Sequence, residues 1–382
     1  MLTNSDITEL TAFRRALHRV PELSGFEVET AARVVAALGD APDRVVAGLG
    51  GHGVAAVFDS GLAGPSVLFR CELDALPIQE ISSAAHRSTI DGKGHLCGHD
   101  GHTTILMGLA RLLARKRPAK GRVILMFQPA EEDGSGAAAV IADPKFDGLH
   151  PDWAFSLHNM PGCKLGECWL AEGPVNCASV GMKITLEGKT SHAAQPEHGV
   201  SPARAVAALI PALGALGQGG PLGPEYRLAT ITHVTLGEPN FGVSPAHGEI
   251  WVTLRTMLDE PMAALRAEAE GLAKAQADAG GLRLTITYHD DFAACANNPQ
   301  ATEVFANVLD RLGIVHDQGD LPERASEDFG RFSNLQGTKG AMVFLGSGLD
   351  HPALHNPDYD FPDDLIPIGT EIFHRITRQI LG

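Results

Sequence analysis

Residues 94–102 carry the densest set of reactive side chains in the sequence. They read Gly-His-Leu-Cys-Gly-His-Asp-Gly-His, so a thiol, three imidazoles and a carboxylate lie among glycines. A thiolate and a neutral imidazole two residues apart, here Cys97 and His99, can bind one divalent ion such as Zn²⁺. A lone Cys-x-His pair is more often an ordinary helix start with solvated histidines. The stretch therefore indicates a metal site only if the chain supplies further donors.

Further donors follow the predicted strands. Four apolar runs are typical of buried strands, at 67–71, 121–129, 153–157 and 341–345. The donors found at their ends or in the loops after them are Asp74, the Glu131–Glu132 pair, His158 and His355. Because the loops after parallel strands meet at one edge of a sheet, we expect these side chains to gather there around metal.

The two adjacent glutamates suit a division of labour. One carboxylate can bind the metal, while the other stays unligated, takes a proton from metal-bound water and returns it to a leaving amine. A bound divalent ion lowers the pKa of its water from about 15.7 towards roughly 7, which supplies hydroxide at neutral pH. The alternative interpretation of such a pair is a solvated acidic surface. In the company of the other donors, the pair indicates amide hydrolysis.

The elements that must position these residues form an α/β protein of two domains. Strands alternating with helices predict a mostly parallel, doubly wound catalytic sheet in residues 1–179 and 293–382. Residues 180–292 follow the order β-α-β-β-α-β, which predicts an inserted α+β ferredoxin-like lid. A helix is expected directly after Cys97 and His99, with Asp100 or Thr103 as its N-cap. On the first predicted helix, we expect His18 to lie at the surface.

Composition excludes several classes of function. The 382 residues carry a formal net charge of −16, which argues against nucleic acid or an anionic membrane as partner. No apolar run is long enough for a membrane span and no signal pattern begins the sequence, so we expect a cytoplasmic protein. Residues 48–53 match G-x-G-x-x-G, but a strand rather than a helix follows. We therefore expect a hairpin there, not a dinucleotide-dependent oxidoreductase.

The motifs together resemble the M20 metallopeptidase family, and specifically its amidohydrolase branch of aminoacylases, hippurate hydrolases and auxin-conjugate hydrolases. The resemblance covers nearly the whole chain. It is carried by seven blocks in the family's order: 70–77, 95–102, Pro129-Ala130-Glu131-Glu132, Leu157-His158, Ser191-His192-Ala193-Ala194-Gln195-Pro196, Ser326-Glu327-Asp328-Phe329 and Leu354-His355-Asn356-Pro357.

The resemblance implies roles for individual residues. Glu131 would be the general acid/base, and Asp74 would lie close to a metal-binding histidine. His192 would reach the site of a neighbouring subunit and stabilise the tetrahedral intermediate, which implies a homodimer formed through the lid domain. Two divalent ions (Zn, Mn, Co or Ni) would be bound by five residues: Cys97, His99, Glu132, His158 and His355.

The substrate contacts are less completely specified. Arg255, on a predicted lid strand, is placed where a guanidinium can hold a substrate carboxylate, although a surface arginine paired with an acid is an equal alternative. The family commonly has Asn-Val-Ile-Pro where this chain has Gly242-Val-Ser-Pro, and the neighbouring Asn240 is a candidate replacement for the missing amide. The expected activity is hydrolysis of N-acyl amino acids. The alternatives are a dipeptidase or carboxypeptidase with the same site, and a catalytically silent binding protein.

Overall fold

The computed structural model describes residues 1–382, which form two compact units. Unit 1 contains Met1–Val175, Cys295–Leu321 and Asp328–Gly382, whereas unit 2 contains Asn176–Ala294 and Pro322–Glu327. The segment 322–327 was expected in the first domain but belongs to unit 2. No helix of either unit combines the length and the apolar character that crossing a bilayer requires.

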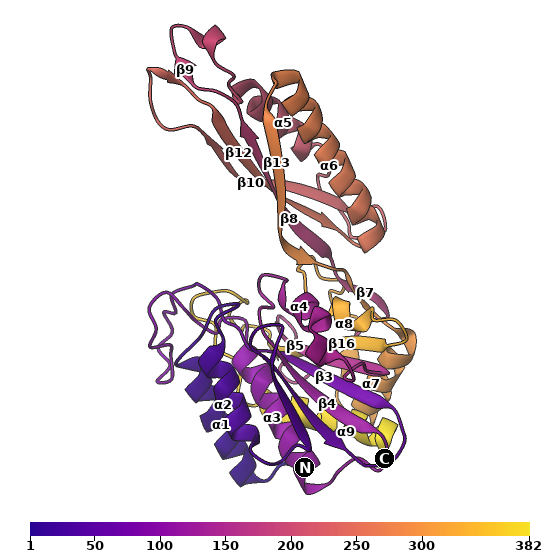
Figure 1. The fold of residues 1–382 in the computed structure, drawn as a ribbon. Coiled ribbons are helices and arrows are strands. Elements are labelled where there is room, and N and C mark those ends of the chain that lie inside the picture. The colour runs from indigo at the N-terminus through magenta and orange to yellow at the C-terminus, as the bar shows by residue number, and fades with distance from the viewer. The chain divides into compact units, whose positions relative to one another are not determined.

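Unit 1 is built on an eight-stranded sheet in the order β1-β2-β4-β3-β5-β16-β6-β15 (Figure 1). The strands β4, β3, β5 and β16 at its centre run parallel to one another, as predicted. At one edge β1 and β2 form the antiparallel hairpin expected around residues 48–53. The strand bounds are Arg44–Leu49 (β1), Gly53–Asp59 (β2), Ser66–Glu72 (β3), Arg122–Gln128 (β4), Trp153–Pro161 (β5), Cys168–Trp169 (β6), His316–Asp317 (β15) and Lys339–Gly348 (β16).

Helices cover both faces of this sheet, and each face has its own apolar core. The side chains of each buried strand point alternately into one core and the other. In β3, for example, Phe69 packs in one core and Leu68 in the other. The first core contains residues of α1 (Asn4–His18), α2 (Val28–Leu38), α3 (His99–Arg115), α7 (Pro299–Leu312) and α9 (Leu365–Leu381). The second contains residues of α4 (Gly136–Ala142), the 3-10 helix η1 (Pro144–Phe146) and α8 (Gly330–Ser333). A short pair, β7 (Gly173–Asn176) and β14 (Cys295–Asn297), completes the unit.

Unit 2 has the predicted β-α-β-β-α-β order. Its antiparallel sheet has the strand order β10-β12-β8-β13, and two helices pack on one face around a separate apolar core (Figure 1). The bounds are β8 (Ala178–Glu187), α5 (Ala203–Gly214), β10 (Arg227–Leu236), β12 (His247–Thr256), α6 (Asp259–Gly280) and β13 (Arg283–Phe292). Smaller elements are β9 (Ser191–His192), η2 (Pro196–His198) and β11 (Val243–Ser244).

Two local predictions are wrong. Helix α3 begins at His99 with Gly98 as its N-cap, and no side chain caps it. Asp100 is instead buried against His18, and the Thr103 hydroxyl donates to the Glu72 carbonyl at 2.7 Å. His18 is therefore not at the helix surface but fully buried. Charged partners, which a helical periodicity does not reveal, hold it there.

Candidate metal centre

The predicted donors of unit 1 come from the carboxyl ends of neighbouring parallel strands. Asp74 follows β3 and the Glu131–Glu132 pair follows β4. His158 was expected after its strand but lies within β5, because pairing with β16 continues as far as Pro161. Cys97 lies in the loop before α3. The sheet thus delivers its donors to one edge, as the topology requires.

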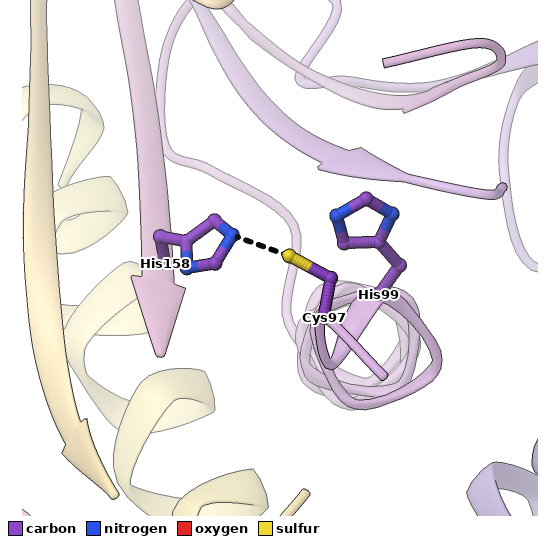
Figure 2. A group of neighbouring side chains, drawn as sticks. All are labelled: Cys97, His99 and His158. Atoms are coloured by element: carbon purple, nitrogen blue, oxygen red, sulfur yellow. Dashed lines mark hydrogen bonds between the residues drawn. The ribbon is translucent and has the colours of Figure 1, made fainter. Parts of the chain in front are cut away.

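Cys97, His99 and His158 form the centre of the cluster (Figure 2). Their ligand atoms all lie within 4.8 Å of one another, and Sγ of Cys97 is 3.4 Å from Nε2 of His158. The His158 Nδ1 donates to the carbonyl oxygen of Asn159 at 2.8 Å, which directs Nε2 towards the thiol. Burial lowers the pKa of His158 to about 3, so this imidazole is neutral and able to bind a metal.

Glu132 and His355 extend the cluster to a second group. Cys97, Glu132 and His355 again have ligand atoms within 4.8 Å of one another, and His355 Nε2 is 3.6 Å from a Glu132 oxygen. His355 adopts a left-handed backbone conformation (φ 66°), and its N–H donates to the carbonyl of Leu96 at 2.8 Å. The loop that carries His355 is thereby fixed to the loop that carries Cys97.

The glutamate pair faces His99. Nε2 of His99 is 3.9 Å from a Glu131 oxygen and 3.8 Å from a Glu132 oxygen, and Glu131 is buried. His99 therefore belongs to both the thiol cluster and a carboxylate cluster. The five predicted ligands lie in these overlapping groups, with Glu131 beside them.

The donor set fits divalent cations on electrostatic grounds. His99 Nε2 is buried and has no hydrogen-bond partner. Burial by itself lowers the pKa of His99, but Asp74, Glu72 and Glu132 outweigh it and raise that pKa to about 10, so the surroundings favour positive charge at this point. Burial, with Glu132 and Glu131, raises the pKa of the Cys97 thiol well above its ordinary value. A cation bound at this thiol would favour the thiolate form.

Two unusual backbone conformations, at Gly98 and Ala130, allow the loops that carry the candidate ligands to approach one another closely. Gly98 has φ 92°, and a Cβ there would lie 1.9 Å from Oδ1 of Asn159. Ala130, immediately before the glutamate pair, has φ 49°, an unusual conformation for alanine. Its N–H donates to the buried Glu27 carboxylate at 2.7 Å, which helps to hold the turn that presents Glu131.

The structure also reveals Glu72 and His102, whose roles the sequence did not predict. His102 Nδ1 is 2.6 Å from Glu72 Oε2, and His102 Nε2 accepts from the backbone N–H of Asn159 at 3.1 Å. Arg70 pairs with Glu72 and, at 2.5 Å, with Asp328. These buried charges lie next to the candidate ligand cluster, since His102 and Glu72 form a group with His99. The available signal was Arg70 and Glu72 themselves, two charged residues in an otherwise apolar central strand.

His192, Asn240 and Arg255 lie in unit 2, whereas all the ligand candidates lie in unit 1. His192 is exposed in β9, and its Nδ1 accepts from the N–H of Ala194 at 3.1 Å, which leaves the ring proton on Nε2. Asn240 accepts from the N–H of Gly242 at 2.6 Å. Nη1 of Arg255 donates at 2.6 Å to both the Arg324 carbonyl and the Ser326 hydroxyl, so its partners are neutral.

Comparison with known proteins identifies the family. Residues 68–379 match the model of peptidase family M20/M25/M40, and the chain belongs to this family, as the motifs predicted. It is 31% identical to the IAA-amino acid hydrolase ILR1-like 5 of Arabidopsis thaliana, over 97% of this chain and 86% of that protein. It is 30% identical to an N-acetyl-L-cysteine deacetylase of Bacillus subtilis, over 98% and 88% of the two chains.

A solved structure agrees with the fold over the whole chain. The YXEP protein of Bacillus subtilis, described as a dinuclear metal-binding peptidase of the M20 family, superposes with a TM-score of 0.81. The sequence identity is 26%, covering 100% of this chain and 99% of that one. The two-unit α/β architecture predicted from the sequence is therefore that of this family.

Proposed function

We propose that this protein is a metal-dependent amidohydrolase that cleaves N-acyl amino acids into a carboxylic acid and a free amino acid. The observation that carries the proposal is the cluster in which a thiol, two imidazoles and two carboxylates meet at Cys97, His99, His158, Glu131 and Glu132, all of them buried except the partly exposed Glu132. The relatives support the substrate class, since they are named for hydrolysis of IAA-amino acids and deacetylation of N-acetyl-L-cysteine.

In this proposal two divalent ions are held by Cys97, His99, Glu132, His158 and His355. When bound, such ions supply Lewis acidity that activates water and polarises the amide carbonyl. The mixture of sulfur, nitrogen and oxygen donors suits Zn²⁺, Mn²⁺, Co²⁺ or Ni²⁺. Asp74 accepts from the backbone N–H of Glu132 at 2.9 Å and also contacts His99, so it orients both a carboxylate and an imidazole ligand.

Glu131 is the proton carrier. Its carboxylate takes a proton from the water whose oxygen forms a bond to the amide carbon. As the carbon–nitrogen bond breaks, the same carboxyl group gives that proton to the departing nitrogen, so the amino acid leaves as a neutral amine. The burial of Glu131 excludes bulk water from this exchange. A silent binding protein would not need an acid at this position.

The residues of unit 2 complete the proposal. His192, with its proton on Nε2, is assigned to stabilise the developing oxyanion in the site of a partner subunit within a homodimer. Arg255, which donates to a neutral carbonyl and a neutral hydroxyl, is assigned to the substrate carboxylate, and Asn240 to a polar substrate group. All six cysteines are buried and none forms a disulfide, which supports a reducing compartment such as the cytoplasm.

The test is a substrate panel assayed with each metal. Metal-free protein receives Zn²⁺, Mn²⁺, Co²⁺ or Ni²⁺ and is offered N-acetyl amino acids, N-benzoyl amino acids and dipeptides. We expect turnover of the acyl amino acids with at least one ion. Glu131→Gln should abolish turnover while its metal content, measured by elemental analysis, stays at that of the parent. Preferred cleavage of dipeptides would replace the proposed substrate class, and full activity of Glu131→Gln would remove Glu131 from its role.

A further inference from the structure

Two buried cations lie one helical turn apart on α1. Arg14 and His18 are both fully buried, and Nη1 of Arg14 is 3.5 Å from Nδ1 of His18. Burial of charge is costly unless the charge is paired, and two adjacent cations repel each other. Their location therefore requires carboxylates from other parts of the chain.

Those carboxylates come from the segments that carry the metal-ligand candidates. Asp100, the residue after His99, lies 2.9 Å from His18 Nδ1 and 3.3 Å from Arg14 Nη1. Asp360 and Asp363, on the segment after His355, lie 2.5 Å and 2.9 Å from Arg14.

A fourth carboxylate closes the network around His18. Glu80, on the segment after Asp74, lies 3.3 Å from His18 Nε2. Burial by itself lowers the pKa of His18, but Asp100 and Glu80 outweigh this effect and raise the pKa to about 10. His18 is therefore an imidazolium at neutral pH.

Packing around the same point leaves little freedom. Phe361 lies in the sequence between Asp360 and Asp363, and a Cβ on Gly101 would come within 2.3 Å of its ring. The segment after His355 is thus seated directly on the first turn of α3. An apolar contact such as that of Phe361 with Gly101 has little directional preference. The ion pairs of Arg14 with the aspartates on both segments specify one relative position of the two segments.

We propose that Arg14 and His18 are positioning residues for the metal centre, because they join the segment after His99 to the segment after His355. The inference rests on the metal centre proposed above. Neither cation is within the ligand cluster, so each acts through Asp100, Glu80, Asp360 or Asp363. The network fixes the spacing between the buried ligands near Cys97 and the half-exposed His355.

Cobalt titration of the metal-free, full-length protein tests this inference without relying on activity. Binding at Cys97 gives a thiolate-to-cobalt absorption band, and the ligand-field bands report coordination geometry. We expect His18→Gln and Arg14→Lys to weaken the binding of at least one of the two ions by about tenfold or more, and to alter these bands. The parent is titrated first, and failure of the parent to bind two ions would overturn the metal centre itself.

A matched control is available on the same pair of helices. Arg115 of α3 is 2.5 Å from the buried Asp6 of α1, so Arg115→Gln also removes a contact between α1 and α3. It should lower the melting temperature but leave cobalt affinity and spectrum unchanged. Parent-like cobalt binding by His18→Gln and Arg14→Lys would overturn the inference, as would equal weakening by Arg115→Gln. If His18→Gln does not fold, the same cobalt titration is made with Asp360→Asn, which should also weaken binding. Parent-like binding by Asp360→Asn would overturn the inference.

Discussion

His99 Nδ1 lies 2.9 Å from the backbone carbonyl oxygen of Asp74 and 3.3 Å from its carboxylate. A carbonyl only accepts, so Nδ1 carries a proton and Nε2 faces the glutamate pair. The other carboxylate oxygen of Asp74 accepts from the N–H of Glu132 and from the hydroxyl of Ser24. One buried side chain therefore connects the imidazole and the carboxylate that we propose as ligands.

Asp74→Asn should weaken metal binding by about 10- to 100-fold, because the neutral amide no longer supports the basicity of His99. Ser24→Ala is the matched control, since it removes one hydrogen bond to Asp74 and leaves the contact with His99 intact. Competition with a chelator measures both affinities. Equal affinities for the parent and Asp74→Asn would contradict the orienting role.

Gly98→Ala should destabilise unit 1 by about 2–4 kcal/mol, combining left-handed backbone strain with overpacking against Asn159. Gly148 has a similar φ of 80° but open space around its Cβ position, so Gly148→Ala reports the backbone strain alone, at about 1 kcal/mol. Urea unfolding compares the two variants. A similar loss of unfolding free energy in both variants would mean that the Asn159 side chain moves aside at little cost.

Arg255→Ala should raise KM for an N-acyl amino acid by about 10- to 100-fold and change kcat little, because a charge-assisted contact to the substrate is lost. Arg283→Ala is the control and should leave KM unchanged, since Arg283 lies on β13 of the same sheet and is 72% exposed beside Glu187. Steady-state kinetics with a free carboxylate substrate and its amide analogue provide the measurement. If the parent does not discriminate between them, Arg255 does not bind the carboxylate.

Mixing Glu131→Gln with His192→Ala protein should restore activity, since a hybrid dimer contains one site with both groups intact. Random exchange of subunits gives about a quarter of the parent activity. A mixture of Glu131→Gln and Glu131→Ala cannot complement and serves as the control. Absence of rescue, with subunit exchange verified, would place His192 in the site of its own subunit.

The pH dependence of stability should report His18. Its pKa is about 10 in the folded protein and about 6.5 in an unfolded chain, so the folded state holds an extra proton between these values. Its stabilisation is complete below pH 6.5 and decreases by about 1.4 kcal/mol per pH unit as the pH rises towards 10. His99, whose pKa is also raised to about 10, adds a slope of its own in metal-free protein, so His18→Gln should lose only the part of the slope that His18 contributes.

Urea unfolding at pH 7, 8 and 9 in a chelator measures the effect. A Trp251→Phe background removes the one tryptophan of unit 2, so fluorescence of Trp153 and Trp169 follows unit 1. Arg115→Gln in the same background should keep the slope of the parent. Parallel slopes for the parent and His18→Gln would show that His18 does not hold the extra proton.

Much of the fold could be predicted because apolar periodicity reports burial directly. The strand around Leu125 and the helix around Leu109 are apolar enough to exclude other interpretations. His18 could not be placed, because its burial depends on Asp100 and Glu80, which are distant in sequence. The same reason applies to His102, whose partner Glu72 belongs to a strand before the loop. Apolar periodicity shows which face of a helix or strand is buried. It does not show which charged residues of other elements pair with that face, because this depends on the tertiary structure.

The proposed donors could be selected as a set from the sequence because their residue types and order match a family pattern, and the structure brings them close together. Their geometry could not be predicted. The extension of β5 past His158 depends on pairing with β16, and the left-handed turn at Ala130 depends on Glu27. Both are contacts between segments far apart in the chain.

The order of the donor residues along the chain has a practical consequence for refolding. His95, Cys97, His99 and His102 are neighbours in any conformation, whereas His355 reaches them only after unit 2 has been made. An unfolded or nascent polypeptide thus already has a short chelating peptide, and ions captured there stabilise the denatured ensemble as well as the native one. Refolding from denaturant should yield more competent enzyme when a chelator is present during the folding step and the ions are supplied afterwards.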